Sequence, residues 1–484
     1  MFNIKRIIGA LCTTVLCSSL QAQVQLPSLG DRISGLISLD DEYALGKEFL
    51  RSVRRSSETI NDPLLYSYLV NATHQLALHS ELQDFRLSFI IIDSPELNAF
   101  AAPGGIIGVN GGLFLNAQTE GEFMSVMAHE LAHVSQRHFA RSVEDAQRRR
   151  IPELATLLAS IIIMGAGDGE SGQAAIMAAQ GLAIENQLRF SRSNEAEADR
   201  VGLRTLYAAG YDPQQMPNMF ERLVDLNRYG TKVPEFLLSH PVTESRIADT
   251  RGRAGRYPAR QATGSLDYQL MRARVLVKYQ RDAQANILDF QRNMETANNE
   301  AQRKGAKYGL SLAYAQNGDY AKALNELEEL QKDDPNRIAY IVTQAEILVQ
   351  QNEAASAITL LERHLRISPG NHPLSMAYAD ALEANRQYLD AARVLERQAA
   401  ARPDDHELWY QIAETQGLVG NVSKVHQARA EYFILVGDFR RAAEQIEYAL
   451  AIETHRTDNG PVLAKLRQRA RDVQQLERTA RTGP

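Results

Sequence analysis

Apolar residues are unevenly distributed along the 484-residue chain, and the blocks that they form predict different elements. Residues 7–20 form a short apolar stretch directly after a basic start. Residues 98–110 combine apolar and β-branched residues with glycines, which is typical of a strand that another backbone approaches closely. From about residue 265 the chain is dominated by Ala, Leu, Gln, Glu and Arg without strand-like alternation, which predicts helices. The pattern indicates a mainly α protein: an α+β part with a small sheet, followed by an all-α part.

The all-α part contains an internal repeat of 34 residues. The positions that recur at this spacing are Pro335, Pro369 and Pro403, and Ala323, Ala357 and Ala391. A unit of this length, with small residues where two helices touch and a proline at its end, predicts tetratricopeptide repeats that stack into a solenoid. The alternative is a helical bundle without repeats, which leaves the recurring proline unexplained. We expect about four units within residues 263–484, degenerate at both flanks, with a register slip after Gly420 and a capping helix after Thr457.

The N-terminal block predicts export. Lys5 and Arg6 precede the apolar residues 7–20, which end near the imperfect small-residue cleavage site Leu20-Gln-Ala22. This pattern predicts a signal peptide over residues 1–22, because the apolar stretch is too short for a transmembrane helix. Both cysteines of the chain lie inside it, so we expect a mature protein without disulfides or catalytic thiols.

Charge argues against a nucleic-acid-binding protein. The formal net charge is −6, and it becomes about −8 without the two basic residues of the signal peptide. Phosphate binding needs clustered Lys and Arg instead. The length allows two or three domains. Together with the signal peptide and the acidic charge, this indicates a soluble, exported protein.

A second apolar block lies in the middle of the chain. Residues 151–164 are almost entirely apolar, residues 165–172 are rich in glycine, and residues 174–184 are apolar again. The first arm has about 14 residues, fewer than the roughly 20 that cross a bilayer. Two interpretations stay open: a buried helical hairpin, or an exposed apolar surface that touches a membrane or unfolded client proteins.

The motif His-Glu-Leu-Ala-His at positions 129–133 carries the strongest chemical signal. Residues 122–128 before it and 134–137 after it predict one continuous helix. On a helix, positions i and i+4 share a face, so His129 and His133 can reach one metal ion. Glu130 between them could polarise a metal-bound water. The alternative is a surface helix that carries two histidines and an acid by chance; the spacing favours a zinc hydrolase.

Two histidines leave a tetrahedral zinc ion short of one protein ligand. His138 does not match the spacing of a third histidine ligand, and we interpret it as a helix-surface residue. Glu195 and Asp199 lie four residues apart and share a helix face. There Glu195 could bind the metal while Asp199 accepts the outer N–H of a ligating histidine. Glu197 points elsewhere and is expected to be solvated, and an ordinary acidic helix is the alternative for the whole segment.

His-Glu-x-x-His at 129–133 and Glu-x-x-Ala-Asp at 195–199 resemble the gluzincin peptidases that include the prenyl-protein endopeptidases and the bacterial membrane heat-shock metalloprotease. The resemblance implies one zinc ion on His129, His133 and Glu195, with Glu130 as the general base. It extends to residues 98–110, which in this family form a strand beside the cleft. An extended substrate could add to the edge of such a strand; the alternative is a core strand with a turn.

One further histidine belongs to this resemblance. His240-Pro241 resembles the His-Pro segment that follows the metal ligands in the secreted, repeat-containing branch of the family. His240 could fill the fourth zinc position and keep the enzyme latent. Alternatively, His240 or Arg246 could stabilise the oxyanion of the tetrahedral intermediate. A third possibility is that His-Pro only starts a turn before a helix at 242–250.

The resemblance to this branch implies a zinc metalloendopeptidase domain over residues 23–262 that acts in a bacterial periplasm, at the inner face of the outer membrane. Its expected partners are unfolded or stalled outer-membrane β-barrel proteins and, through the repeat array, the β-barrel assembly machinery. Repeat arrays of this kind bind proteins along a concave surface and perform no chemistry. Two alternatives stay open: a chaperone or scaffold with a resting metal site, or a zinc peptidase of soluble periplasmic proteins.

Overall fold

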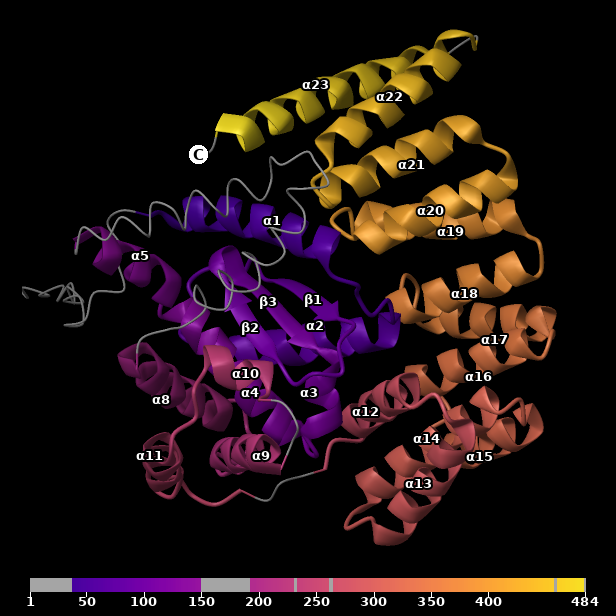
Figure 1. Ribbon diagram of the computed structural model, residues 1–484. Helices are drawn as coiled ribbons and strands as arrows, with labels where there is room; N and C mark the ends of the chain where they lie inside the picture. Colours follow the sequence, from indigo (N-terminus) through magenta and orange to yellow (C-terminus); the bar gives the residue numbers. More distant parts are fainter. Residues whose placement is uncertain (1–36, 149–191, 230–232, 261–263, 457–458, 483–484) are drawn as a thin grey trace, which may run out of the picture. The chain divides into compact units, whose positions relative to one another are not determined.

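The computed structural model describes residues 37–148, 192–229, 233–260, 264–456 and 459–482 (Figure 1). The predicted signal peptide, its two cysteines and the apolar arms within residues 151–184 lie outside these ranges. Among the described helices we find none with both the length and the hydropathy of a membrane span. The described residues are mainly helical and contain one small sheet, which confirms the predicted fold class.

The sheet lies in the first part of the chain. Its described strands are β1 (Ser88–Ile92), β2 (Ala99–Ala102) and β3 (Ile106–Asn110), in the order β1-β3-β2. β3 runs parallel to β1 and antiparallel to β2. The segment 98–110 therefore forms two strands and not one, because Gly104 and Gly105 adopt positive φ angles of 69° and 76° and turn the chain between them. β2 is left at an edge of the sheet.

Helices surround this sheet and position the predicted site (Figure 1). In chain order they are α1 (Leu39–Ser56), α2 (Pro63–Ala77), α3 (Gly111–Asn116), α4 (Glu120–Ser135), α5 (His138–Arg148), α8 (Arg192–Ala208), α9 (Gln215–Tyr229), α10 (Glu235–Ser239) and α11 (Glu244–Ala254). α4 is buried along nearly its whole length, and the Thr119 side chain caps its start by accepting a hydrogen bond from the Glu122 amide. The predicted continuation of this helix to Arg137 is wrong, because Arg137 adopts a left-handed φ of 51°.

A close contact between α4 and α8 brings the two predicted metal-binding segments together. Gly202 of α8 faces the backbone of α4, where a Cβ atom would lie only 3.0 Å from the carbonyl carbon and oxygen of Ala128. The absence of a side chain at Gly202 therefore lets the two helices approach closely. As a result, Glu195 and Asp199 on α8 lie directly against His129 on α4.

The second part of the described chain is entirely helical. Its helices are α12 (Leu266–Tyr279), α13 (Ala283–Thr296), α14 (Glu300–Gln316), α15 (Tyr320–Asp333), α16 (Ile338–Gln350), α17 (Ala354–Ile367), α18 (His372–Ala384), α19 (Tyr388–Ala401), α20 (His406–Val419), α21 (Val422–Leu435), α22 (Phe439–Thr454) and α23 (Gly460–Thr482). Figure 1 shows them stacked in chain order. Ala323, Ala357 and Ala391 are fully buried, as expected of small residues where the helices of a repeat touch. The expectation of about four units with a capping helix after Thr457 stays a prediction.

Candidate metal centre

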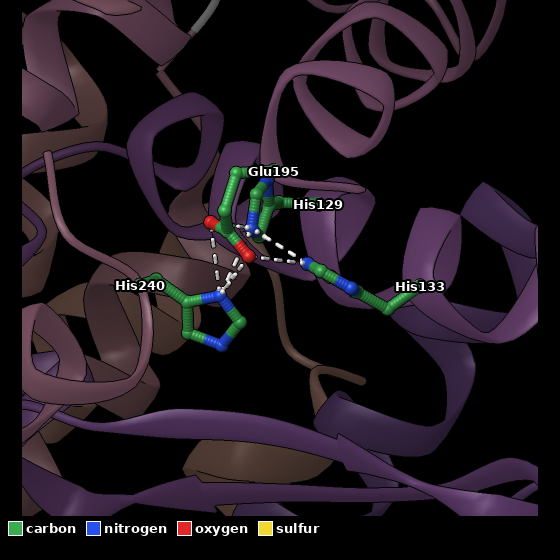
Figure 2. A group of neighbouring side chains, drawn as sticks. All are labelled: His129, His133, Glu195 and His240. Carbon is green, nitrogen blue, oxygen red and sulfur yellow. Dashed lines mark hydrogen bonds and ion pairs between the residues drawn. The ribbon is translucent and has the colours of Figure 1, made fainter. Parts of the chain in front are cut away.

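Four buried side chains from three helices meet at one place (Figure 2). α4 supplies His129 and His133, α8 supplies Glu195, and His240 caps the C-terminal end of α10. The Nε2 atoms of the two α4 histidines are 3.0 Å apart, and each lies 3.4 or 3.5 Å from a carboxylate oxygen of Glu195. One possible ligand atom from each of the four residues lies within 4.8 Å of the others. The structure thus brings the three predicted metal ligands together with His240.

The chemistry of this donor set fits a metal ion. Three imidazole nitrogens and one carboxylate oxygen are ligand types that zinc accepts. Burial alone would lower the pKa of His129, yet Asp199 and Glu195 outweigh burial and raise that pKa to about 10. Burial and the neighbouring His129 instead hold the pKa of His133 well below its usual range. Buried carboxylates that attract a proton this strongly are suited to attract a cation.

Asp199 and Arg246 support His129 from the outer side of its ring. Asp199 Oδ1 lies 3.0 Å from His129 Nδ1, the nitrogen that points away from the cluster. Arg246 donates two hydrogen bonds to the same carboxylate, at 2.8 and 2.7 Å. Burial alone would raise the pKa of Asp199, but the hydrogen bonds from His129 and Arg246 outweigh it and hold that pKa below its usual value. The carboxylate is therefore ionised and fixes the orientation of His129, in the position predicted for it.

Arg246 also contacts a second carboxylate and the backbone. Its guanidinium also lies 2.9 Å from Glu195 and donates to the carbonyl oxygen of Pro241 at 2.8 Å. Every nitrogen of the guanidinium is thus committed to a partner within the protein. This arrangement holds the carboxylates of Asp199 and Glu195 beside the cluster.

Glu130 is buried beside the cluster. Burial raises the pKa of its carboxyl group, while His240 and His129 act in the opposite direction. One of its carboxylate oxygens lies 3.6 Å from His240 Nε2. A buried carboxylate with a raised pKa is suited to accept and return a proton.

His240 is held in the cluster by the short helix α10. Its Nδ1 atom lies 3.1 and 3.2 Å from the two oxygens of Glu195, and its ring stacks on Phe236 at a centroid distance of 4.8 Å. At the start of α10, Glu235 accepts hydrogen bonds from Asn98 and Asn110, at 3.2 and 3.4 Å. The His-Pro segment does precede a helix, α11, but the side chain of His240 points into the cluster and does not merely start a turn (Figure 2).

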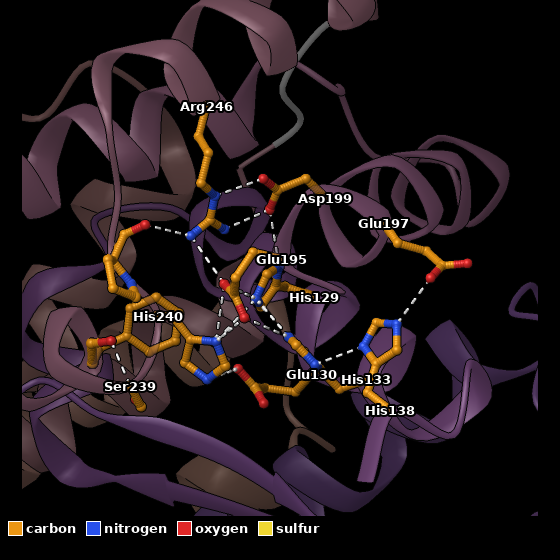
Figure 3. A network of polar contacts seen from close by, with 12 residues as sticks. His129, Glu130, His133, His138, Glu195, Glu197, Asp199, Ser239, His240 and Arg246 are labelled. Carbon is orange, nitrogen blue, oxygen red and sulfur yellow. Dashed lines mark hydrogen bonds and ion pairs between the residues drawn. The ribbon is translucent and has the colours of Figure 1, made fainter. Parts of the chain in front are cut away.

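The predictions of a helix-surface His138 and a solvated Glu197 are wrong. His138 is 0% exposed and not on the surface, and its Nδ1 atom lies 2.9 Å from Nδ1 of His133 (Figure 3). Glu197 is not merely solvated, because one of its oxygens lies 3.3 Å from His138 Nε2 and 2.9 Å from Arg141. The helix is expected to continue to Arg137, but α4 ends at Ser135 and the left-handed turn at Arg137 redirects the chain, which brings His138 against His133. The sequence gives only a weak indication of the contact between His138 and Glu197, namely an acid two residues before Asp199 and a histidine five residues after His133.

Comparisons with known proteins agree with this fold and site. Residues 63–254 match Peptidase family M48, and residues 348–414 match a tetratricopeptide repeat family. The protein is therefore a metal-dependent peptidase of family M48 that is joined to tetratricopeptide repeats. A Vibrio cholerae relative is 38% identical over 340 residues, which cover 69% of this chain and 70% of that protein. The beta-barrel assembly-enhancing protease of Escherichia coli strain K12 is 35% identical over 341 residues, which cover 70% of this chain and 69% of that protein. This chain belongs to the family of beta-barrel assembly-enhancing proteases.

The peptidase half is also similar to a more distant protein. The mitochondrial metalloendopeptidase OMA1 of Schizosaccharomyces pombe is 28% identical over 217 residues, which cover 44% of this chain and 60% of that protein.

Proposed function

We propose that this chain is a zinc metalloendopeptidase of the bacterial periplasm that promotes the assembly of outer-membrane β-barrel proteins and degrades precursors that stall. The observation that carries the proposal is the buried cluster of His129, His133, Glu195 and His240, with Glu130 beside it. The relatives are named for enhancing β-barrel assembly, and we assign the same process to this chain. Expected binding partners are unfolded β-barrel proteins and the machinery that inserts them.

The proposed chemistry distributes roles among the residues of the cluster. His129, His133 and Glu195 hold one zinc ion, which when bound supplies a Lewis acid for the peptide carbonyl and lowers the pKa of water. Glu130 takes a proton from the attacking water and delivers it to the leaving amine, a task that suits its raised pKa. Asp199 keeps His129 in the ligating tautomer and orientation.

The edge strand β2 offers a place for the substrate. β2 pairs with β3 through one side, and the Ala101 backbone is close enough to Glu130 to lower its pKa against the effect of burial. An extended peptide that adds to this edge would be held mainly by backbone hydrogen bonds, which tolerate many sequences. That mode suits an enzyme whose clients are unfolded chains.

His240 keeps the proposed enzyme latent. Its Nδ1 atom lies 3.3 Å from His129 Nε2 and within 3.2 Å of both Glu195 oxygens, so it occupies the position that a substrate carbonyl or water needs. His240→Ala should therefore raise the basal cleavage of unfolded protein. An unchanged or lower rate would instead assign His240 to support of the transition state.

The proposed domain boundaries are those that the sequence pattern predicts. Residues 1–22 are a signal peptide, residues 23–262 the peptidase domain and residues 263–484 the repeat array. The array docks clients or the assembly machinery along its concave surface. We place the protein in the periplasm, as a peripheral partner of the outer membrane, with residues 151–184 as a candidate contact.

The decisive experiment replaces Glu130 by Gln in the full chain. The variant should keep its zinc content and lose cleavage of unfolded protein, while the control Glu328→Gln at an exposed position of α15 should change neither. Proteins captured by Glu130→Gln in cells should be outer-membrane β-barrel proteins; soluble periplasmic proteins would refute the assigned substrate class. If Glu130→Gln left β-barrel assembly intact and only deletion of residues 263–484 abolished it, the chain would act as a scaffold.

A further inference from the structure

Both α4 histidines have a partner at the nitrogen that points away from the cluster (Figure 3). For His129 this partner is the carboxylate of Asp199, which Arg246 holds in turn. For His133 it is another imidazole: the Nδ1 atoms of His133 and His138 are 2.9 Å apart. The outer partners of the two histidines therefore differ in kind: a carboxylate for His129 and an imidazole for His133.

The support of His133 continues to a carboxylate through the ring of His138. His138 Nε2 lies 3.3 Å from an oxygen of Glu197, and Arg141 donates to the same oxygen at 2.9 Å. The chain of contacts thus runs from His133 through His138 and Glu197 to Arg141. It parallels the contacts from His129 through Asp199 to Arg246, and both end at an arginine.

The backbone places His138 for this contact. α4 ends at Ser135, and Arg137 adopts its left-handed conformation so that α5 starts in a new direction with His138. The side chain of Arg137 is itself fixed by an ion pair of 3.2 Å to the buried Glu42. A left-handed conformation is unfavourable for a residue with a Cβ atom, so this turn is maintained by its surroundings.

The direction of the hydrogen bonds follows from the acceptor at the end of the chain. An ionised carboxylate only accepts, so Glu197 requires the proton of His138 to be on Nε2. Nδ1 of His138 then carries a lone pair and accepts the N–H of His133 Nδ1. That proton position leaves the lone pair of His133 on Nε2, the nitrogen that faces Glu195.

We infer, on the basis of the zinc site proposed above, that His138 and Glu197 are positioning residues that fix the tautomer and the ring orientation of His133. Neither of them belongs to the cluster of His129, His133, Glu195 and His240. Outer partners of ligating histidines commonly change metal affinity by about 10–100-fold when they are removed. Loss of the His138 acceptor should therefore weaken zinc binding by a factor in this range.

The test compares two substitutions of His138 in the full chain. His138→Phe keeps the ring volume and removes both nitrogens, whereas His138→Asn retains an oxygen acceptor near the position of Nδ1. We expect His138→Phe to bind Zn²⁺ about 10–100-fold more weakly in competition with a chelating dye. We expect His138→Asn to recover most of that loss. With Co²⁺ in place of Zn²⁺, the visible absorption bands should shift in His138→Phe and return towards the wild type in His138→Asn.

Two further variants control for folding. Glu197→Ala changes a partly exposed side chain, should leave the fold intact and should weaken Zn²⁺ binding by about tenfold. His364→Phe replaces a buried histidine of the repeat array and should leave Zn²⁺ affinity unchanged.

Unchanged Zn²⁺ affinity in a folded His138→Phe protein would overturn the inference. Equal loss in His138→Phe and His138→Asn would do so as well, because ring shape rather than the hydrogen bond would then matter. If the wild-type chain itself bound no Zn²⁺, the proposed function would fail instead, so the two failures are distinguishable.

Discussion

Gly202→Ala tests the close contact of α4 and α8 on which the site depends. The added Cβ atom would lie 3.0 Å from the carbonyl group of Ala128 and 3.1 Å from the His129 amide nitrogen. These are backbone atoms of a buried helix, so neither can rotate away. Ordinary contacts begin at 3.4 Å, so the two helices must separate by a few tenths of an ångström.

Two opposing effects determine how much Gly202→Ala changes the free energy of unfolding. Overpacking a well-packed core costs about 1–3 kcal/mol, while replacing glycine by alanine inside a helix stabilises by about 0.5–1 kcal/mol. Gly252→Ala in α11 isolates the second effect, because no atom lies within 4 Å of the Cβ that it adds. The free energy of unfolding should therefore be about 1–3 kcal/mol lower for Gly202→Ala than for Gly252→Ala.

Urea denaturation of both variants and a chelator competition for Zn²⁺ provide the measurement. Because α8 carries Glu195, Gly202→Ala should also bind Zn²⁺ more weakly than the wild type, whereas Gly252→Ala should not. Equal unfolding free energies in the two variants, together with equal Zn²⁺ affinities, would refute the assigned role of this contact.

Three further predictions concern charge, pH and the repeats. Arg246→Met leaves the buried carboxylate of Asp199 without its cation and should cost about 3–5 kcal/mol of unfolding free energy in urea denaturation; a loss below about 1 kcal/mol would contradict the ion-pair assignment. Burial lowers the pKa of His406 to about 3, so the unfolded chain binds more protons below pH ~6.5. Stability should fall as the pH is lowered from there towards 3, and His406→Phe should flatten this dependence of the urea midpoint. Ala357→Leu overpacks a helix contact and should cost about 1–3 kcal/mol, whereas Ala355→Leu on the exposed side of α17 should change stability by less than about 0.5 kcal/mol.

The part of the site that depends on helical spacing could be predicted from the sequence. His129 and His133, like Glu195 and Asp199, are four residues apart, and this spacing alone places each pair on one face of its helix. The place of His138 could not be predicted in this way. A single residue, Arg137, leaves the helical region, and nothing in its side chain favours the left-handed conformation.

Only part of the repeat array could be predicted from the sequence. Its 34-residue period is visible because proline and alanine recur at fixed positions in the central units. One period before Ala323 the chain has Asp289, and one period after Ala391 it has Val425. These positions lie in α13 and α21, which therefore lack the recurring alanine. Buried residues of these two helices include Phe290 and Ile434.

The contact between Glu197 and His138 has a consequence for how this family can diverge. Three acids lie at alternate positions of α8 and have different roles: Glu195 contacts His129 and His133 inside the cluster, Asp199 contacts the outer nitrogen of His129, and Glu197 contacts His138. Replacing His138 leaves the acid at position 197 with its contact to Arg141 but without the imidazole that it supports, while positions 195 and 199 stay constrained by their own contacts. Related sequences should therefore gain and lose His138 and Glu197 as a pair, and this covariation would mark the lineages in which His133 is supported through a second imidazole.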